Sequence, residues 1–511
     1  MSFFPTRRQF VNSSLVAGAS VGLADFAFLH GLPPVSAEDV KNVRSKVKLN
    51  PDIEPLVGLI EDTPRDKLLD AVVGEMRKGV GYQELLAALL LAGVRSIQPR
   101  PVGFKFHAVL VVNSAHLASL AMPDKERWLP LFWALDNFKS SQARNQQEGG
   151  WFMGPVAESK LPSGHDARER FIEAMDHWDE EGADAAIASL VRHAGAGEII
   201  ELFWRYGARD FRDIGHKAIY AANSWRTLQT IGWRHAEPVM RSLAYAILEH
   251  EDGNPAQRDA EPDRPWRENL KRAGLIRPDW QRGQVKQEAS KDLLHALRSA
   301  SYGDACDFVV GLLNKGIDPS SVWDGLFLRA GELLMQQPGI IGIHCVTSVN
   351  ALHFGYQNSG SDETRRMLVL QAAAFLALFF KRMRGPGKLR EDLQIDSLEA
   401  TGVGSNGGQA VEEILADISK DRVTAARKTI ALVSGSNANV APLMTAARRL
   451  IFSKGTDSHD YKFSSASLED FYNTTPAWRA RLLATSMFNL KGTGDRNNNL
   501  MERAKAALAN T

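Results

Sequence analysis

Cysteine is scarce in this sequence, and its scarcity excludes several kinds of metal site. Only Cys306 and Cys345 occur among the 511 residues. Two thiols cannot build a zinc ribbon or a four-thiolate iron–sulfur cluster, and the absence of C-x-x-C-H argues against covalently attached c-type haem. Cys345 lies in an apolar run, so we expect two buried thiols that act as small hydrophobic side chains.

An excess of charge of either sign is also missing. The formal net charge is +1, and no block of like charges is long enough to form a basic arm or an acidic tail. The glycine-rich runs near 385–388 and 402–408 follow no predicted strand and match no phosphate-binding loop, and neither H-E-x-x-H nor G-x-S-x-G occurs. We therefore expect no nucleic-acid partner and no nucleotide site.

The N-terminus carries a pattern typical of export. Arg7 and Arg8 precede Phe10 and a moderately apolar stretch that ends near Leu32. Small residues at 35–37 suit cleavage by a signal peptidase, so residues 1–37 are predicted to be a twin-arginine signal peptide. The stretch contains Asp25 and several glycines, which makes it a poor membrane span, although an uncleaved anchor is the alternative.

This pattern predicts a periplasmic or otherwise exported protein that meets the twin-arginine export machinery and has no stable membrane span in its mature form. The twin-arginine route transports folded proteins, often with a cofactor already inserted. The pattern therefore favours a metal or redox site in the mature chain.

Helical periodicity dominates residues 38–511, whereas alternating strand patterns are scarce. We predict an all-α fold, a multi-helix globular bundle made of two packed helical halves, 38–250 and 288–511, joined by a polar loop at 250–287. A second loop is expected at 385–408, and Asp124 and Ser467 are expected to be helix N-caps. Apolar residues recur three and four apart in these stretches: 65–95, 183–206, 236–250, 288–314, 320–336, 366–384, 409–434 and 440–453.

Three histidines lie on apolar helical faces, where a polar ring requires a partner. They are His107, His216 and His344. Burial of an unpaired polar group costs about 1–3 kcal/mol, so each ring must be hydrogen-bonded or bound to a metal. His116 and His353 are nine residues beyond His107 and His344, about half a turn away on a helix, and therefore point in other directions.

His459 stands three residues before Lys462, which places both side chains on one helical face. A protonated lysine cannot bind a metal, but burial and a nearby cation favour the neutral amine. A neutral amine can take up carbon dioxide and form a carbamate with oxygen ligands. The alternative is a solvated surface lysine.

For the remaining histidines, ordinary structural positions are expected. His116, His235 and His353 are interpreted as core histidines with satisfied hydrogen bonds, and His250 as a charge at a helix C-terminus. Four others lie in charged surroundings and are expected to be solvated: His165, His177, His193 and His295.

Four segments together resemble the questin oxidase-like proteins. FKFHAVLVVNSAHLASLAMPDKERWLPLF resembles the first histidine helix of that family, and GHKAIYAANSW with the later RSLAYAIL resembles its H-P-L-I-x-L-x-Y element and the following helix. IHCVTSVNALHF resembles the H-x-V-T-x-x-x-A-L helix, and DSHDYKFSSA resembles the C-terminal H-x-x-K element. The segments occur in the order of the family and span roughly residues 65–490.

The resemblance implies an all-helical oxidoreductase with a mononuclear non-haem iron held by histidines and a carboxylated lysine. The implied metal ligands are His107, His216, His344, His459 and Lys462. The implied activity is that of a dioxygenase acting on an aromatic or polyketide-like small molecule, with dioxygen as the second substrate.

The sequence departs from the family at two motif positions. Phe106 stands where Asn is usual, and Lys217 stands where Pro is usual. The N-terminal signal and the segment 250–287 also differ from the fungal members. Six aromatic residues are candidates for the lining of a substrate pocket, with a core position as their alternative: Trp128, Trp133, Trp225, Trp233, Phe354 and Tyr356.

Two other functions fit the same residues. A zinc hydrolase would use the histidines to hold a Lewis acid with one open position. A non-enzymatic helical binding protein would keep the fold without a working site. Dioxygen dependence distinguishes iron from zinc, and metal content distinguishes both enzymes from the binding protein.

Overall fold

The computed structural model describes residues 45–385, 389–404, 407–435 and 439–509. Within these ranges the chain is helical, with one isolated bridge between Gln284 and Ile317 and no strand. The predicted all-α fold is therefore confirmed. Residues 46–511 form one compact unit, and none of the described helices is long and apolar enough to cross a membrane. The predicted signal peptide, residues 1–37, lies outside the described residues.

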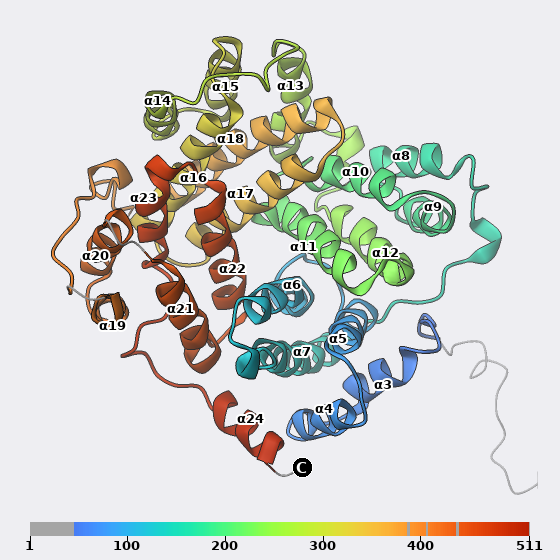
Figure 1. The fold of residues 1–511 in the computed structure, drawn as a ribbon. Coiled ribbons are helices and arrows are strands. Elements are labelled where there is room, and N and C mark those ends of the chain that lie inside the picture. The colour runs from blue at the N-terminus through green and yellow to red at the C-terminus, as the bar shows by residue number, and fades with distance from the viewer. Residues whose placement is uncertain (1–44, 386–388, 405–406, 436–438, 510–511) are drawn as a thin grey trace, which may run out of the picture. The chain divides into compact units, whose positions relative to one another are not determined.

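The helices that precede the polar stretch at 250–287 include two central ones, α6 and α11 (Figure 1). With the labels of Figure 1, these helices are α3 (Glu54–Asp62), α4 (Leu68–Arg77), α5 (Tyr82–Ser96), α6 (His107–Leu120), α7 (Leu129–Gln147), α8 (Ala167–His177), α9 (Glu180–His193), α10 (Ala196–Gly207), α11 (His216–Ile231) and α12 (Ala236–Ile247).

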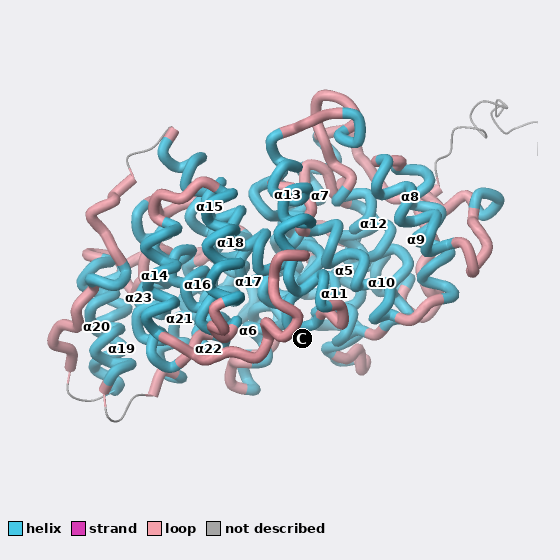
Figure 2. The backbone as a smooth tube through the Cα atoms, turned by 90° about the horizontal axis from the view of Figure 1, so that it is seen from above, coloured by secondary structure: helices cyan, strands magenta, loops and turns pink. Residues whose placement is uncertain are grey.

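The later helices include α17 and α22, which face the first two. Figure 2 shows α16, α17 and α18 side by side, and these three helices pack against one another. These helices are α13 (Arg264–Ala273), α14 (Gln287–Leu297), α15 (Tyr302–Asn314), α16 (Pro319–Gln336), α17 (Ile340–Asn358), α18 (Asp362–Arg384), α19 (Gly407–Ile418), α20 (Arg422–Ser434), α21 (Ala441–Lys454), α22 (Ser458–Asn473), α23 (Pro476–Ser486) and α24 (Leu500–Ala509).

Four of the predicted helical stretches are each divided into two helices. The stretches are 65–95, 183–206, 288–314 and 409–434. In two of them a polar side chain begins the second helix: Ser301 accepts a hydrogen bond from the amide of Asp304, and Asp421 accepts one from the amide of Val423. Apolar periodicity continues across such a break because both helices bury one face in the same core.

Both predicted N-caps are wrong. Asp124 begins a short 3-10 turn (Asp124–Glu126), and α7 starts later, after Trp128. Ser467 lies inside α22, where its hydroxyl group bonds back to the carbonyl of Ser464. Side chains of this type compete for backbone groups inside a helix as well as at its start, so residue type alone did not locate the caps.

The stretch 250–287 is not an uninterrupted loop, because it contains α13 and two 3-10 turns. α13 has ten residues and a strongly polar outer face. The sequence pattern did not predict this helix, because proline, glycine and charged residues surround it. In the stretch 385–408, the described residues form loops, one short 3-10 turn (Ile395–Ser397) and the first two residues of α19, which begins at Gly407.

Four helices at the centre of the unit form a closed ring. α6 packs against α11 and α22, and α17 packs against the same two helices (Figure 1). Each predicted half therefore contributes two helices to the ring. α6 and α17 are buried around nearly their whole circumference, which explains why their sequences have no polar face.

Candidate metal centre

All four helices of the ring begin beside one point. His107 and His216 are the first residues of α6 and α11, His344 lies in the second turn of α17, and His459 is the second residue of α22. The helix starts bring together residues that are more than 100 positions apart in the sequence. Lys462 follows one turn after His459 on the same face of α22, as the spacing predicted.

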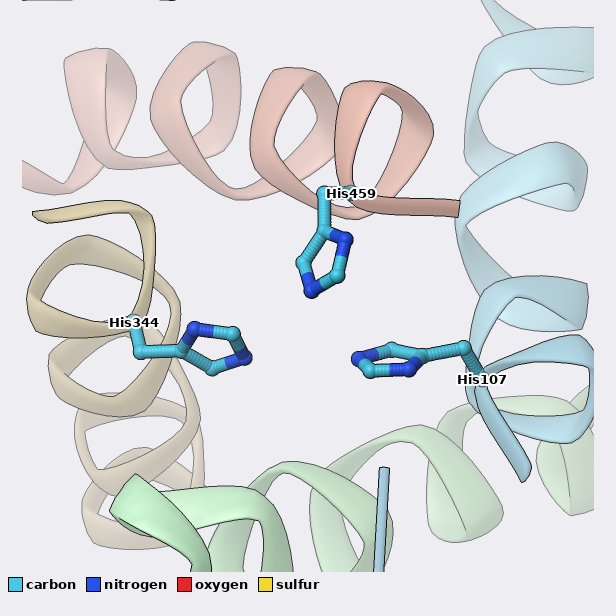
Figure 3. A group of neighbouring side chains, drawn as sticks. All are labelled: His107, His344 and His459. Atoms are coloured by element: carbon cyan, nitrogen blue, oxygen red, sulfur yellow. The ribbon is translucent and has the colours of Figure 1, made fainter. Parts of the chain in front are cut away.

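The Nε2 atoms of the histidines face one another. The Nε2 of His216 lies 3.0 Å from that of His107 and 2.8 Å from that of His344. Ligand nitrogens of His107, His344 and His459 lie within 4.8 Å of one another, and Figure 3 shows these three rings converging from separate helices. Two nitrogens that bind one ion at about 2.1 Å and at right angles lie about 3.0 Å apart, so this spacing suits shared coordination.

Backbone carbonyl groups fix the tautomer of three rings. The Nδ1 atoms of His107, His216 and His344 lie 2.9, 2.6 and 2.6 Å from the carbonyl oxygens of Phe104, Asp213 and Ile340, respectively. A carbonyl oxygen only accepts hydrogen bonds, so each Nδ1 carries the proton and each Nε2 presents a lone pair. Hydrogen bonds of this kind orient imidazole ligands in metalloproteins.

His459 completes the group from the fourth helix. Its Nδ1 lies 3.2 Å from Oδ1 of Asp457, the N-cap of α22, and its buried Nε2 has no hydrogen-bond partner in the described part of the chain. The carboxylate again places the proton on Nδ1 and leaves the lone pair of Nε2 unused. A lone pair in this position is available to bind a metal ion.

Lys462 is buried and lies inside the histidine group, so the surface alternative for this residue is wrong. Its Nζ is 2.8 Å from the Nε2 of His344 and 3.3 Å from the Nε2 atoms of His107 and His216. Burial lowers the pKa of Lys462 to about 7, which makes the neutral amine accessible near neutrality.

The donor set fits a shared cation. The Nε2 atom of His216 lies close to those of His107 and His344, and His459 forms a second group with the same two histidines. The ammonium group of Lys462 offers at most three N–H donors, which face His107, His216 and His344, so the lone pair of His459 remains unused. Burial, followed by the charge of Lys462, holds the pKa values of His107, His216 and His344 well below their usual range. Neutral imidazoles of this kind suit iron, zinc, copper or nickel, so the residues fit a metal ion.

A cavity of 1120 Å³ opens onto the histidine group. Its wall combines apolar side chains near the histidines with charged side chains from the loop after α12 and from the end of α18. Burial and the neighbouring Glu249 raise the pKa of Asp213, in this wall, to about 8. The cavity gives a small molecule access to the Nε2 atoms of the candidate ligands.

Two glycines allow close packing around His216. A Cβ on Gly103 (φ +129°) would lie 3.1 Å from Cε1 of His216, and a Cβ on Gly215 (φ +82°) would lie 2.6 Å from Cβ of Ser348. Both positions have the left-handed backbone that glycine adopts without strain. The two glycines therefore let the His216 ring approach its neighbours.

The histidines interpreted as core residues are buried away from this group. His116 lies between the hydroxyl groups of Tyr82 (3.1 Å) and Thr230 (3.2 Å). His353 packs among aromatic rings such as Trp323, but its Nδ1 has no hydrogen-bond partner among the described residues, so the prediction of satisfied hydrogen bonds is wrong for this ring. His235 is also buried and accepts a hydrogen bond from Arg234. The four histidines expected to be solvated are exposed: His165, His177, His193 and His295.

His250 lies close to the C-terminus of α12, as expected: the helix ends at Ile247, and the Nδ1 of His250 is 2.9 Å from the carbonyl oxygen of the C-cap Leu248. His250 also lines the cavity. None of the six candidate pocket aromatics lines the cavity; Trp133, for example, is buried and stacks on Tyr461 with ring centroids 4.0 Å apart. Aromatic rings fill the helical core because of their apolar area, which was the alternative for these residues.

Sequence reasoning missed the residues that orient the histidines and line the cavity. Phe104 and Ile340 hold His107 and His344 through their carbonyl groups, and their side chains are 65% and 59% exposed at the cavity. A backbone carbonyl leaves no signature in residue type. Asp457 did leave one, since an aspartate directly before a predicted helix start is a typical N-cap.

Both cysteines are free and buried, as expected, with their thiols directed at carbonyl groups of Leu370 and Ile341. The helices and the convergent histidines are therefore the features on which a function can be argued. Comparison with models of protein families, with curated proteins and with solved structures finds no match to this chain.

Proposed function

We propose that this protein is an exported, metal-dependent oxidoreductase of the dioxygenase type, with a non-haem iron ion and an aromatic or polyketide-like small molecule as its substrate. The observation that carries the proposal is a group of histidine rings beside a cavity, in which His107 and His344 lie close to both His216 and His459. The resemblance of four sequence segments to questin oxidase-like proteins supplies the choice of iron and dioxygen.

In this proposal, the metal is held by His107, His216, His344 and His459. Carbonyl groups and the Asp457 carboxylate keep each Nδ1 protonated, so each Nε2 is available without the loss of a proton. When bound, the iron would activate dioxygen next to the substrate. Burial of the histidines would exclude water from that reaction.

Lys462 is proposed to bind the metal as a carbamate. A neutral lysine amine and carbon dioxide combine to form a carbamate anion and release one proton. The lowered pKa of Lys462 supports this step, because a free amine is required. Four helix N-termini with partial positive charge also meet here, and they favour an anionic ligand over an ammonium group.

Metal analysis of the protein purified after export tests the proposal. We expect close to one iron per chain, and we expect His107→Ala or His344→Ala to remove it. His116→Ala is the matched control, because this histidine is on α6 but bonds to Tyr82 and Thr230 instead. A wild-type protein without a transition metal would refute the proposal, and zinc without dioxygen consumption would favour a hydrolase.

The proposed export rests on the twin-arginine pattern at Arg7 and Arg8. We expect the wild-type chain in the periplasmic fraction with its N-terminus near residue 38. Replacement of both arginines by lysine should retain the precursor in the cytoplasm. Equal export of the two chains would refute this assignment.

A further inference from the structure

A strained turn precedes His216. Asp213, Ile214 and Gly215 have φ values of +53°, +48° and +82°, so three successive residues adopt left-handed backbone. This conformation is uncommon for residues other than glycine and is an outlier for a β-branched residue such as Ile214. Strain of this kind persists where surrounding structure holds it and is concentrated at functional sites.

Orientation of His216 does not explain the carboxyl group in this turn. The carbonyl oxygen of Asp213 accepts the Nδ1–H of His216, and any residue has that carbonyl. Phe104 and Ile340 perform the same task for the other two rings with apolar side chains. An aspartate side chain at 213 therefore requires a separate reason.

The position of this carboxyl group is unfavourable for folding. Its Oδ2 is buried and has no hydrogen-bond partner among the described residues, and Glu249 lies next to it. Glu249 is itself fixed, because its Oε2 accepts a hydrogen bond of 2.8 Å from the amide of Val102. A buried acceptor without a donor and a neighbouring carboxyl group both lower stability.

The carboxyl group lies in the wall of the cavity that opens onto the candidate metal centre. Beyond the charged neighbours of this carboxyl group, apolar side chains line the same cavity, among them Ile214, Phe211, Ile340 and Phe104. An unused acceptor in an apolar wall matches a ligand with an apolar body and one N–H or O–H donor.

We propose that Asp213 is a substrate-binding residue that accepts a hydrogen bond from a hydroxyl or amine group of an otherwise apolar substrate, with Glu249 holding it in place. This inference deepens the proposed function, since it assigns a substrate class to the cavity of the same centre. It predicts that Asp213 lowers stability and increases ligand affinity.

Stability separates this role from a structural one. We expect Asp213→Asn to raise the temperature of unfolding, because asparagine tolerates left-handed backbone and removes the second carboxyl group. The backbone carbonyl remains, so metal content should not change. Asp184→Asn is the matched control: it removes an ion pair with Arg241, neither residue lines the cavity, and the change should lower the unfolding temperature. A lower unfolding temperature for Asp213→Asn would overturn the proposal.

Binding provides the second measurement. The probes are 1-naphthylmethanol, 1-naphthylmethylamine and 1-methylnaphthalene, which share one apolar body and differ in the donor group. Calorimetry on the wild-type protein should give at least about tenfold tighter binding for the alcohol or the amine than for the methyl compound, a difference of about 1.4 kcal/mol. Asp213→Ala, which has no side-chain acceptor, should remove that difference, whereas Asp213→Asn keeps an amide oxygen that accepts a hydrogen bond and should retain most of it.

Each outcome decides the question. The order of the alcohol and the amine identifies which donor the site prefers. Equal binding of all three probes, binding of none, or an unchanged difference in Asp213→Ala would overturn the proposal. Metal content tests the metal assignment independently, because stability and probe binding do not depend on iron.

Discussion

Replacement of Lys462 tests the centre most directly, because this side chain contacts three of the four histidines. In Lys462→Met, three buried Nε2 acceptors lose their donor at a cost of about 1–3 kcal/mol each. The variant also avoids a cost, because it no longer buries an ammonium group. Burial lowers the pKa of Lys462 from 10.5 to about 7, which corresponds to roughly 5 kcal/mol. The two terms are similar, so the metal-free variant should unfold close to the wild type.

Metal binding should respond much more strongly than stability. If Lys462 binds iron as a carbamate, Lys462→Met and Lys462→Arg both lose that ligand, since a guanidinium group forms no carbamate. We expect more than about tenfold weaker iron binding, equivalent to 1.4 kcal/mol, in both variants. Lys462→Glu supplies a carboxylate on a shorter arm and should recover part of the affinity.

The assay is iron titration followed by thermal unfolding, with and without added bicarbonate. Bicarbonate should strengthen iron binding in the wild-type protein and leave the three variants unchanged. Wild-type iron affinity in Lys462→Arg, independent of bicarbonate, would refute the carbamate. The candidate centre would then consist of the four histidines alone.

Three further predictions concern the surroundings of the centre. Gly103→Ala places a Cβ 3.1 Å from the His216 ring and should lower both stability and iron content. Gly79→Ala is the control, because this position has similar backbone strain (φ +107°) but open space around it, and it should lower stability alone. Metal analysis distinguishes the two variants. His353→Phe should make the free energy of unfolding less sensitive to acid. Burial lowers the pKa of His353 in the folded protein to about 3, so below pH 6.5 the unfolded chain binds more protons than the folded protein. The stability of the wild-type protein therefore falls as the pH is lowered. Urea unfolding should show a loss of roughly 2 kcal/mol from pH 7 to 5 that the variant lacks, and identical slopes would contradict this. Lys217→Met removes the shorter of two ion pairs of the fully buried Asp210, which keeps Arg212 at 3.5 Å, and should cost up to about 3–5 kcal/mol in urea unfolding. A cost below about 1 kcal/mol would contradict a stabilising role of this ion pair.

The spacing of residues within a helix could be interpreted from the sequence alone. Apolar periodicity identified the all-α class, and the three-residue spacing of His459 and Lys462 placed both side chains on one face of α22. The opposite directions of His107 and His116 on α6 were likewise predicted from the helical repeat. These properties depend only on the geometry of a single helix.

Helix ends were harder to locate than helices. Ser467 has the side chain of an N-cap but lies inside α22, and α13 has too little apolar surface to stand out in a polar stretch. Caps depend on local backbone conformation and on competing hydrogen bonds, which residue type does not specify.

The centre itself depends on tertiary structure. His107, His216, His344 and Lys462 meet because α6, α11, α17 and α22 close a ring, and no sequence spacing encodes contacts across gaps of more than 100 residues. The burial of Lys462 and the strain at Asp213 follow from that packing. The helical class and the residues that share a helical face could be predicted from the sequence, since both follow from a local repeat. Which faces meet depends on the packing of distant helices, and this packing is a cooperative property of the whole core.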